Sequence, residues 1–167
     1  VIAVSLKWKL RTQLKSLHHE FGHTMIYVTH DQTEALTFAD KVVVMYDGRV
    51  VQMGTPQELF ETPEHTFVGY FIGSPGMNVL AAEVQGDTAV IGGTQIALGK
   101  GFGRPTGNVE LGVRPEFTSL SAGDAGLPVT IKRVEDVGRH KIVRADFQGT
   151  EINILAGEGE NISPDMN

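Results

Sequence analysis

A histidine directly follows an apolar run in the first part of the chain. Thr24–Thr29 reads Thr-Met-Ile-Tyr-Val-Thr, and His30 and Asp31 come directly after it. The run predicts a buried strand, and the polar residues behind it predict a short helix near Gln32–Ala39. Because open α/β sheets bind ligands beyond the carboxyl ends of their strands, His30 is the first candidate for site chemistry. Asp31 has two open roles, orienting the imidazole ring or capping the helix.

Other polar clusters offer weaker candidates. His18, His19 and His23 surround the end of a predicted helix, where they are either metal ligands or ordinary surface side chains. The same helix carries several basic residues, which favour a solvated face over one that binds anionic lipid or an acidic partner. Arg114-Pro115-Glu116 is a rigid tripeptide with opposite charges. It suits either a fixed contact at an interface or a solvated turn.

The first part of the chain also contains sequence patterns that predict helices and a hairpin around these candidate residues. Apolar residues at helical spacing predict a helix over 6–21, which Gly22 is placed to end. Asp47-Gly48 between two apolar runs predicts a β-hairpin. Thr55-Pro56-Gln57-Glu58 is a capping box that predicts a helix over Pro56–Glu61. Thr62-Pro63-Glu64 repeats the start signal for a further helix that ends at Gly73.

The second part of the chain has a different character. Residues 79–167 hold 14 of the 20 glycines, and short apolar runs separated by turn residues predict a small all-β barrel or sandwich. The predicted strands are Asn78–Val84, Ala89–Ile91, Gln95–Leu98, Val109–Val113, Val129–Val137, Lys141–Phe147 and Glu151–Ala156. Gly73-Ser74-Pro75-Gly76 predicts the linker, so we expect one domain at 1–75 and another at 76–167.

The composition narrows the function classes. The chain has 167 residues, a net charge of −6 and no cysteine. Disulfides and thiolate metal sites are excluded, and general nucleic-acid binding is disfavoured by the negative charge. No apolar run approaches the ~20 residues that span a bilayer.

Five linked segments resemble the ATP-binding subunits of ABC transporters. They are Val28–Ala35 (Val-Thr-His-Asp-Gln-Thr-Glu-Ala), a short helix, Asp40–Met45, Gly48–Pro56 and the helix that follows. Ile72–Asn78, Leu111–Glu116 and Val134–Gly138 are similar to the regulatory domain of the sugar-importer branch, which includes maltose and glycerol-phosphate importers. The resemblance implies the C-terminal part of an α/β ATPase domain followed by an OB-like (TOBE) barrel.

The resemblance also implies a function. His30 would be the switch histidine that contacts the γ-phosphate of ATP, with ATP and Mg²⁺ bound only by the intact subunit. Expected partners are a second copy of the chain, the transmembrane permease subunits and a regulatory protein on the barrel, where Arg114 and Glu116 would lie at the interface. The protein would be cytoplasmic and peripheral on the inner face of the cell membrane.

Departures from the family pattern limit this expectation. The sequence has no Gly-x-x-x-x-Gly-Lys-Ser/Thr loop, no Leu-Ser-Gly-Gly-Gln signature and no strand ending in Asp-Glu, and Ala3 stands where the family has an aspartate. We therefore expect a fragment that is inactive alone and whose barrel lacks its last strands. The alternative is a non-enzymatic module that binds a ligand or a partner through the OB-like barrel.

Overall fold

The structure is a computed structural model that describes residues 4–99, 105–121 and 126–162. The chain divides into two compact units, Val1–Val68 and Gly69–Asn167. The division falls within the helix α4, Thr66–Phe71, a few residues before the Gly73–Gly76 turn. A domain boundary near residue 75 stays a prediction.

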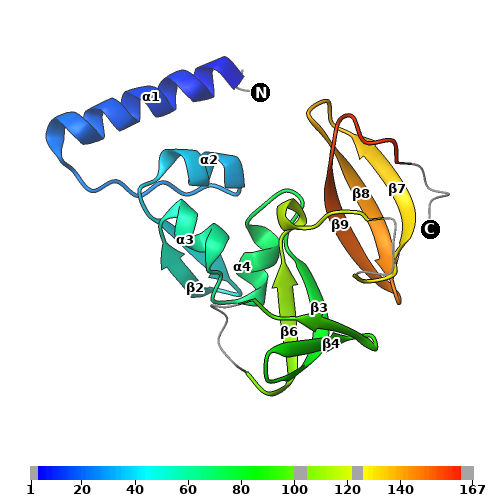
Figure 1. The fold of residues 1–167 in the computed structure, drawn as a ribbon. Helices are drawn as coiled ribbons and strands as arrows, with labels where there is room; N and C mark the ends of the chain where they lie inside the picture. Colours follow the sequence, from blue (N-terminus) through cyan, green and yellow to red (C-terminus); the bar gives the residue numbers. More distant parts are fainter. Residues whose placement is uncertain (1–3, 100–104, 122–125, 163–167) are drawn as a thin grey trace. The chain divides into compact units, whose positions relative to one another are not determined.

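Unit 1 begins with the predicted long helix, α1, Val4–Phe21 (Figure 1). Gly22 ends it with a positive φ of 64° and an N–H that donates to the carbonyl of His18 at 2.9 Å. The apolar stripe of α1 is not buried within the described structure, because Leu10 and Phe21 remain 53% and 58% exposed. The helical spacing thus predicted the helix correctly. The apolar stripe, which such spacing normally places in a core, is not buried among the described residues.

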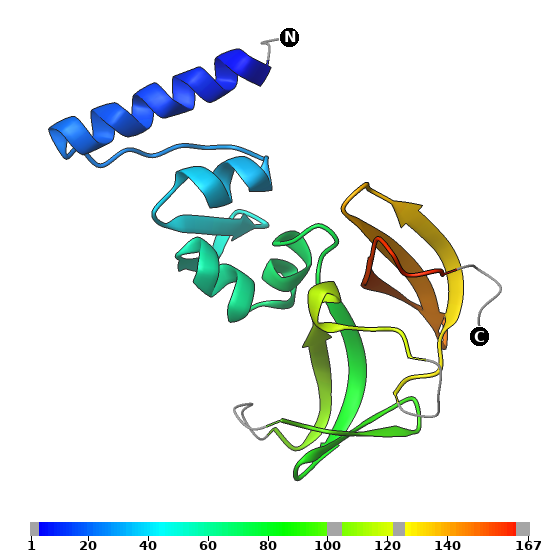
Figure 2. The same ribbon diagram turned by 45° about the horizontal axis from the view of Figure 1, so that its top comes forward.

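The predicted strand over Thr24–Thr29 is wrong. None of the three described sheets includes this segment, which runs as an unpaired extended chain between α1 and the next helix (Figure 2). Ile26 and Val28 are each 90% exposed. A strand needs a neighbour to pair with its peptide groups, and no described strand lies in register with this one. The α/β arrangement expected for the first part is therefore not formed; this part consists of helices and one hairpin.

The hairpin and the first capped helix of unit 1 are confirmed. Strands β1 (Val42–Tyr46) and β2 (Arg49–Gly54) pair antiparallel. The turn residues Asp47 and Gly48 have φ of 49° and 72°, as a type I′ turn requires. Helix α3, Pro56–Glu61, follows with a complete capping box.

Helix α4 begins later than predicted, at Thr66 instead of at the Thr62-Pro63-Glu64 signal. The N–H of Glu64 donates to Gln52 Oε1 at 2.9 Å, and Gln52 Nε2 donates to the carbonyl of Thr62 at 3.1 Å. These two bonds from the buried Gln52 side chain hold residues 62–64 in a non-helical conformation. His65 instead accepts the N–H of Phe67 at the start of α4.

Unit 2 contains all seven predicted strands, arranged in two antiparallel sheets (Figure 1). The first sheet has the order β5-β4-β3-β6 and the second has the order β7-β8-β9. The strands are β3 (Asn78–Gln85), β4 (Thr88–Ile91), β5 (Thr94–Ala97), β6 (Gly107–Val113), β7 (Thr130–Asp136), β8 (His140–Phe147) and β9 (Thr150–Gly157). A 3₁₀ turn, η1 (Pro115–Phe117), follows β6.

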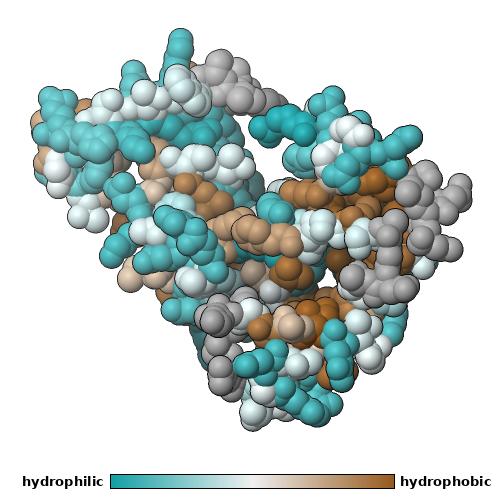
Figure 3. All heavy atoms as spheres, viewed as in Figure 1, coloured by the Kyte–Doolittle hydropathy of each residue, from teal (hydrophilic) through white to brown (hydrophobic). Residues whose placement is uncertain are grey.

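The two sheets share one hydrophobic core. Leu80 and Ile91 of the first sheet belong to the same buried cluster as Val143, Phe147 and Ile154 of the second. Figure 3 shows apolar side chains, in brown, gathered on both sheets. The strict alternation of buried and exposed residues along β3 and β9 explains why period-two patterning predicted these strands. Among the described helices, none is long and apolar enough to cross a lipid bilayer.

Candidate functional site

The candidate site lies on the turn Thr29–Asp31, where the extended segment meets helix α2, Gln32–Phe38. Asp31 is the N-cap of α2, and its Oδ1 accepts the N–H of Glu34 at 3.0 Å. Of the two roles left open for Asp31, the structure shows helix capping. The helix begins at Gln32, two residues after His30, with the N-cap Asp31 between them.

The side chain of His30 is exposed at this turn. Among the residues that the structure describes, none has a hydrogen bond to its imidazole. Both ring nitrogens are thus accessible to a ligand, and a neutral imidazole offers one N–H donor. Such a group is suited to donate a hydrogen bond to an anionic oxygen brought from outside the described residues.

A buried carboxylate, Glu34, lies directly behind the turn. It is 6% exposed and accepts three hydrogen bonds, from Arg11 Nη2 at 3.0 Å, Tyr27 Oη at 3.1 Å and Thr29 Oγ1 at 3.1 Å. Lys7 Nζ lies 3.7 Å from the same carboxylate. This cluster ties α1, the extended segment and α2 together, and it does so within unit 1.

The surroundings of Glu34 favour its charged form. Burial raises the pKa of this carboxyl, but the hydrogen bonds from Thr29 and Tyr27 and the positive charge of Arg11 outweigh burial and leave its pKa below the usual 4.5. The same hydrogen bond raises the pKa of the Tyr27 phenol, because an ionised phenol could not donate to a carboxylate. Glu34 is therefore an ionised acceptor at neutral pH.

Sequence reasoning missed Glu34. A local signal was present, since a glutamate three residues after an N-cap residue is the acidic member of a capping box. The basic residues on α1 were a second signal, because a buried carboxylate needs cations or donors to pair with it. Neither signal could place α1 against this turn without the tertiary fold.

The two residues predicted at an interface, Arg114 and Glu116, differ in their exposure. Arg114 is 3% exposed, and its Nη1 donates to the carbonyl of Ile72. A role for Arg114 and Glu116 at a regulatory interface stays a prediction. Burial lowers the pKa of its guanidinium, which Glu116 partly offsets. Glu116 is exposed on η1 next to Phe117, which is 77% exposed. The carbonyl of Ile72 lies just before the turn that leads into β3, so this bond of Arg114 lies within unit 2.

The histidines near the end of α1 make internal contacts. His18 Nδ1 donates to the carbonyl of His23 at 2.6 Å, and its Nε2 lies 3.6 Å from Asp40 Oδ2. Within the described ranges no group of three or more His, Asp or Glu side chains could hold a metal ion. Ala3, where the family has an aspartate, lies outside the described residues.

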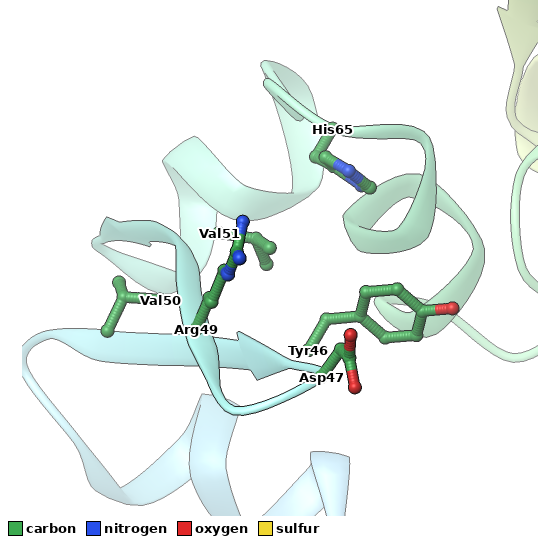
Figure 4. A pocket seen from close by; sticks show the side chains of 6 residues that line it. All are labelled: Tyr46, Asp47, Arg49, Val50, Val51 and His65. Carbon is green, nitrogen blue, oxygen red and sulfur yellow. The ribbon is translucent and has the colours of Figure 1, made fainter.

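A separate hollow of about 520 Å³ opens beside the hairpin (Figure 4). Tyr46, Asp47 and Arg49 come from the hairpin turn and its strand ends, and His65 comes from the segment before α4. The Tyr46 ring lies 4.3 Å from the ring of Phe67 and 6.3 Å from that of His65. None of the sequence-predicted site residues lines this hollow.

Comparison with known proteins shows where the chain belongs. The family model described as the MalK OB fold domain matches residues 73–117. The chain is 37% identical over 166 residues to the sn-glycerol-3-phosphate import ATP-binding protein UgpC 2 of Agrobacterium fabrum, covering 95% of this chain and 44% of that protein. It is 39% identical over 147 residues to UgpC of Vibrio vulnificus, covering 87% of this chain and 40% of that protein.

A third relative is named for a different transported solute. The sulfoquinovosyl glycerol transport ATP-binding protein SmoE of Agrobacterium fabrum is 41% identical over 145 residues, covering 83% of this chain and 40% of that protein. Over most of its own length the chain matches part of the ATP-binding subunits of ABC importers for sugars and related solutes. It spans less than half the length of the relatives it matches. The resemblance in the two sets of motifs is thereby confirmed, and an OB fold is present in unit 2.

The similarity to importer ATP-binding subunits gives the turn at His30 a context. The relatives are named for ATP binding and for import, and the described residues offer one exposed imidazole on a capped, hydrogen-bonded turn. The donor set fits one contact to an anionic phosphate oxygen. It does not by itself surround a triphosphate or a metal ion.

Proposed function

We propose that this chain acts as the C-terminal part of the ATP-hydrolysing subunit of an ABC importer for sugars or related solutes. The observation that carries the proposal is His30, exposed on a turn held from behind by Asp31 and Glu34. ATP with Mg²⁺, bound by the intact subunit, supplies the phosphoryl group whose transfer to water powers transport.

His30 acts as a hydrogen-bond donor to the γ-phosphate. Phosphoryl transfer spreads negative charge over the equatorial oxygens, and catalysis consists mainly of placing donors around them. The neutral imidazole donates one ring N–H to such an oxygen.

The barrel of unit 2 serves dimerisation and regulation in this proposal. The intact subunits pair with each other and dock on transmembrane permease subunits. A regulatory protein binds the surface around η1, where Glu116 and Phe117 offer a carboxylate beside an exposed ring. Arg114 supports this surface from inside by hydrogen-bonding the carbonyl of Ile72. The boundary between the ATPase part and the barrel lies near residue 75.

The test is a chimeric subunit in which this chain replaces the matching 166-residue stretch of UgpC 2 from Agrobacterium fabrum. His30→Ala should lower kcat for ATP by about 10²–10³-fold, the usual cost of removing one preorganised donor. His19→Ala, the same substitution at an exposed histidine of α1, should leave kcat unchanged. The chain alone should show no ATPase activity.

Two outcomes would overturn the proposal. A His30→Ala chimera with the kcat of the parent chimera would remove the role of His30. Thermal stabilisation of the isolated chain by an oligonucleotide, a saccharide or molybdate would favour the alternative, a non-enzymatic binding module, because a specific ligand stabilises the fold by mass action.

A further inference from the structure

Both neighbours of His30 are bonded to the same residue. Thr29 Oγ1 donates to the carboxylate of Glu34 at 3.1 Å, and the N–H of Glu34 donates to Asp31 Oδ1 at 3.0 Å. Thr29 Oγ1 also accepts the N–H of Asp31 at 3.0 Å. The peptide that carries His30 is thus enclosed by a short ring of hydrogen bonds that passes through Glu34.

This ring is a variant of the ordinary capping box. In α3, Glu58 stands three residues after the N-cap, and its Oε2 accepts the N–H of Thr55 directly at 2.7 Å. In α2, Glu34 stands at the equivalent position, but the N–H of the N-cap residue Asp31 donates to the Thr29 hydroxyl. This hydroxyl in turn donates to the Glu34 carboxylate, so the two hydrogen bonds form a relay. The relay draws one more residue, Thr29, into the cap and so fixes the chain on both sides of His30.

The carboxylate that ends the relay is itself anchored. Its Oε1 accepts from Arg11 of α1, and its Oε2 accepts from Tyr27 as well as from Thr29. The Glu34 side chain is almost fully buried, so water does not compete for these bonds. Only the Thr29 bond leads on to the turn, whereas the Tyr27 bond ends at a ring that packs against Phe38 at 5.2 Å.

We propose that Glu34 is the positioning residue of His30, acting through the hydroxyl of Thr29 to hold the Thr29–Asp31 turn in one conformation. The inference rests on the role proposed for His30 above. Rigid placement matters because a donor contributes to phosphoryl transfer only if it is in place before the charge develops. The exposed imidazole has no described partner of its own, so the backbone beneath it supplies the rigidity.

Two variants of the isolated chain isolate the relay. Thr29→Val and Tyr27→Phe each remove one hydroxyl donor from the same Glu34 oxygen, but only the first breaks the link to Asp31. Backbone ¹⁵N relaxation should give order parameters near 0.85 for residues 29–31 in the parent and in Tyr27→Phe, and below about 0.6 in Thr29→Val. Glu34→Gln should resemble Thr29→Val; if that variant does not fold, the matched hydroxyl pair still decides.

Three results would overturn the proposal: an unchanged turn in Thr29→Val, equal loosening in Tyr27→Phe, or a turn already mobile in the parent.

In the chimeric subunit, Thr29→Val should lower kcat at least about fivefold while KM for ATP stays within about twofold, since placement and not ground-state binding is lost. Glu58→Gln, the matched change in the other capping box, should alter neither constant. A His30→Ala chimera with full activity would refute the proposed function alone, and the order parameters would still decide the anchoring.

Discussion

The side-chain amide of Asn78 joins the two sheets of unit 2, and its removal should weaken the whole unit. Asn78 Nδ2 donates to the carbonyl of Asn153 at 2.7 Å, and the N–H of Asn153 donates back to Asn78 Oδ1 at 2.8 Å. Asn153 lies on β9, the edge strand of its sheet, and Asn78 begins β3 of the other sheet. The amide thus pairs with β9 as a neighbouring strand would. Asn78→Ala removes both hydrogen bonds at once.

The expected loss follows from the burial of the two partners. Asn78 is 3% exposed, and its loss leaves one N–H and one carbonyl of Asn153 unpaired. Each buried polar group left unpaired costs about 1–3 kcal/mol, which gives an upper range of about 2–6 kcal/mol. Asn153 is only half-buried, so water reaches it in part. We therefore expect the lower part of that range, about 2–3 kcal/mol.

Hydrogen exchange of core amides on β8 and β9 is the suitable assay. The only tryptophan, Trp8, lies on α1, so fluorescence does not report on unit 2. Asn108→Ala is the matched control, because Asn108 is an exposed asparagine on β6 whose replacement should cost less than about 0.5 kcal/mol. If Asn78→Ala slows or speeds exchange no more than Asn108→Ala does, the amide does not join the sheets and the reasoning fails.

Three further predictions concern the linker and the site. Gly76→Ala should destabilise unit 2 by about 1–3 kcal/mol, because its Cβ would lie 2.2 Å from the carbonyl oxygen of Tyr70; hydrogen exchange measures the loss. Arg114→Met should cost about 1–3 kcal/mol in urea unfolding followed by circular dichroism, since the carbonyl of Ile72 loses its buried donor. The Glu34 carboxyl should titrate below its usual pKa of 4.5 in a ¹³C NMR titration, so the stability it contributes is complete above pH 4.5 and is lost as the pH falls through the lower, folded value.

Each of these predictions has a control within the chain. Gly159→Ala meets no atom within 4 Å and should be neutral. Arg133→Met changes an arginine whose side chain is 70% exposed and should have little effect. Glu34→Gln should remove the part of the acid dependence that belongs to Glu34. Equal losses in a variant and its control, or a Glu34 midpoint at or above 4.5, would contradict the corresponding prediction.

Local chemistry made the hairpin, the capped helix α3 and the barrel strands predictable. The Asp47-Gly48 turn needs two positive φ angles, which few residue pairs adopt, so the sequence signal is specific. The capping box of α3 is closed by bonds between residues three apart. In β3 and in most of β9, buried residues alternate with more exposed ones. In each case the determining contacts are short in sequence or repeat with a fixed period.

The errors arose where a distant partner decides the structure. Thr24–Thr29 has strand composition, but strand formation depends on a neighbour that composition does not reveal. The start of α4 depends on Gln52, which takes the backbone groups of Thr62 and Glu64. Glu34 was missed as part of the site because its donors come from α1 and from the extended segment. The identity of the family was still predictable, since it rests on the order of motifs and not on their contacts.

The motifs that identify the family contain all four polar side chains that are buried in the described structure: Glu34, Gln52, Asn78 and Arg114. Each of them bonds a segment where regular backbone pairing stops, namely the His30 turn, the connection from α3 to α4, the edge of β9 and the turn before β3. An apolar residue at any of these positions would remove these hydrogen bonds and leave their backbone or hydroxyl partners without them. The presence of these four motif residues is therefore explained by the hydrogen bonds that they form to neighbouring segments. His30 is exposed and forms no such joint among the described residues, which is consistent with the role proposed for it.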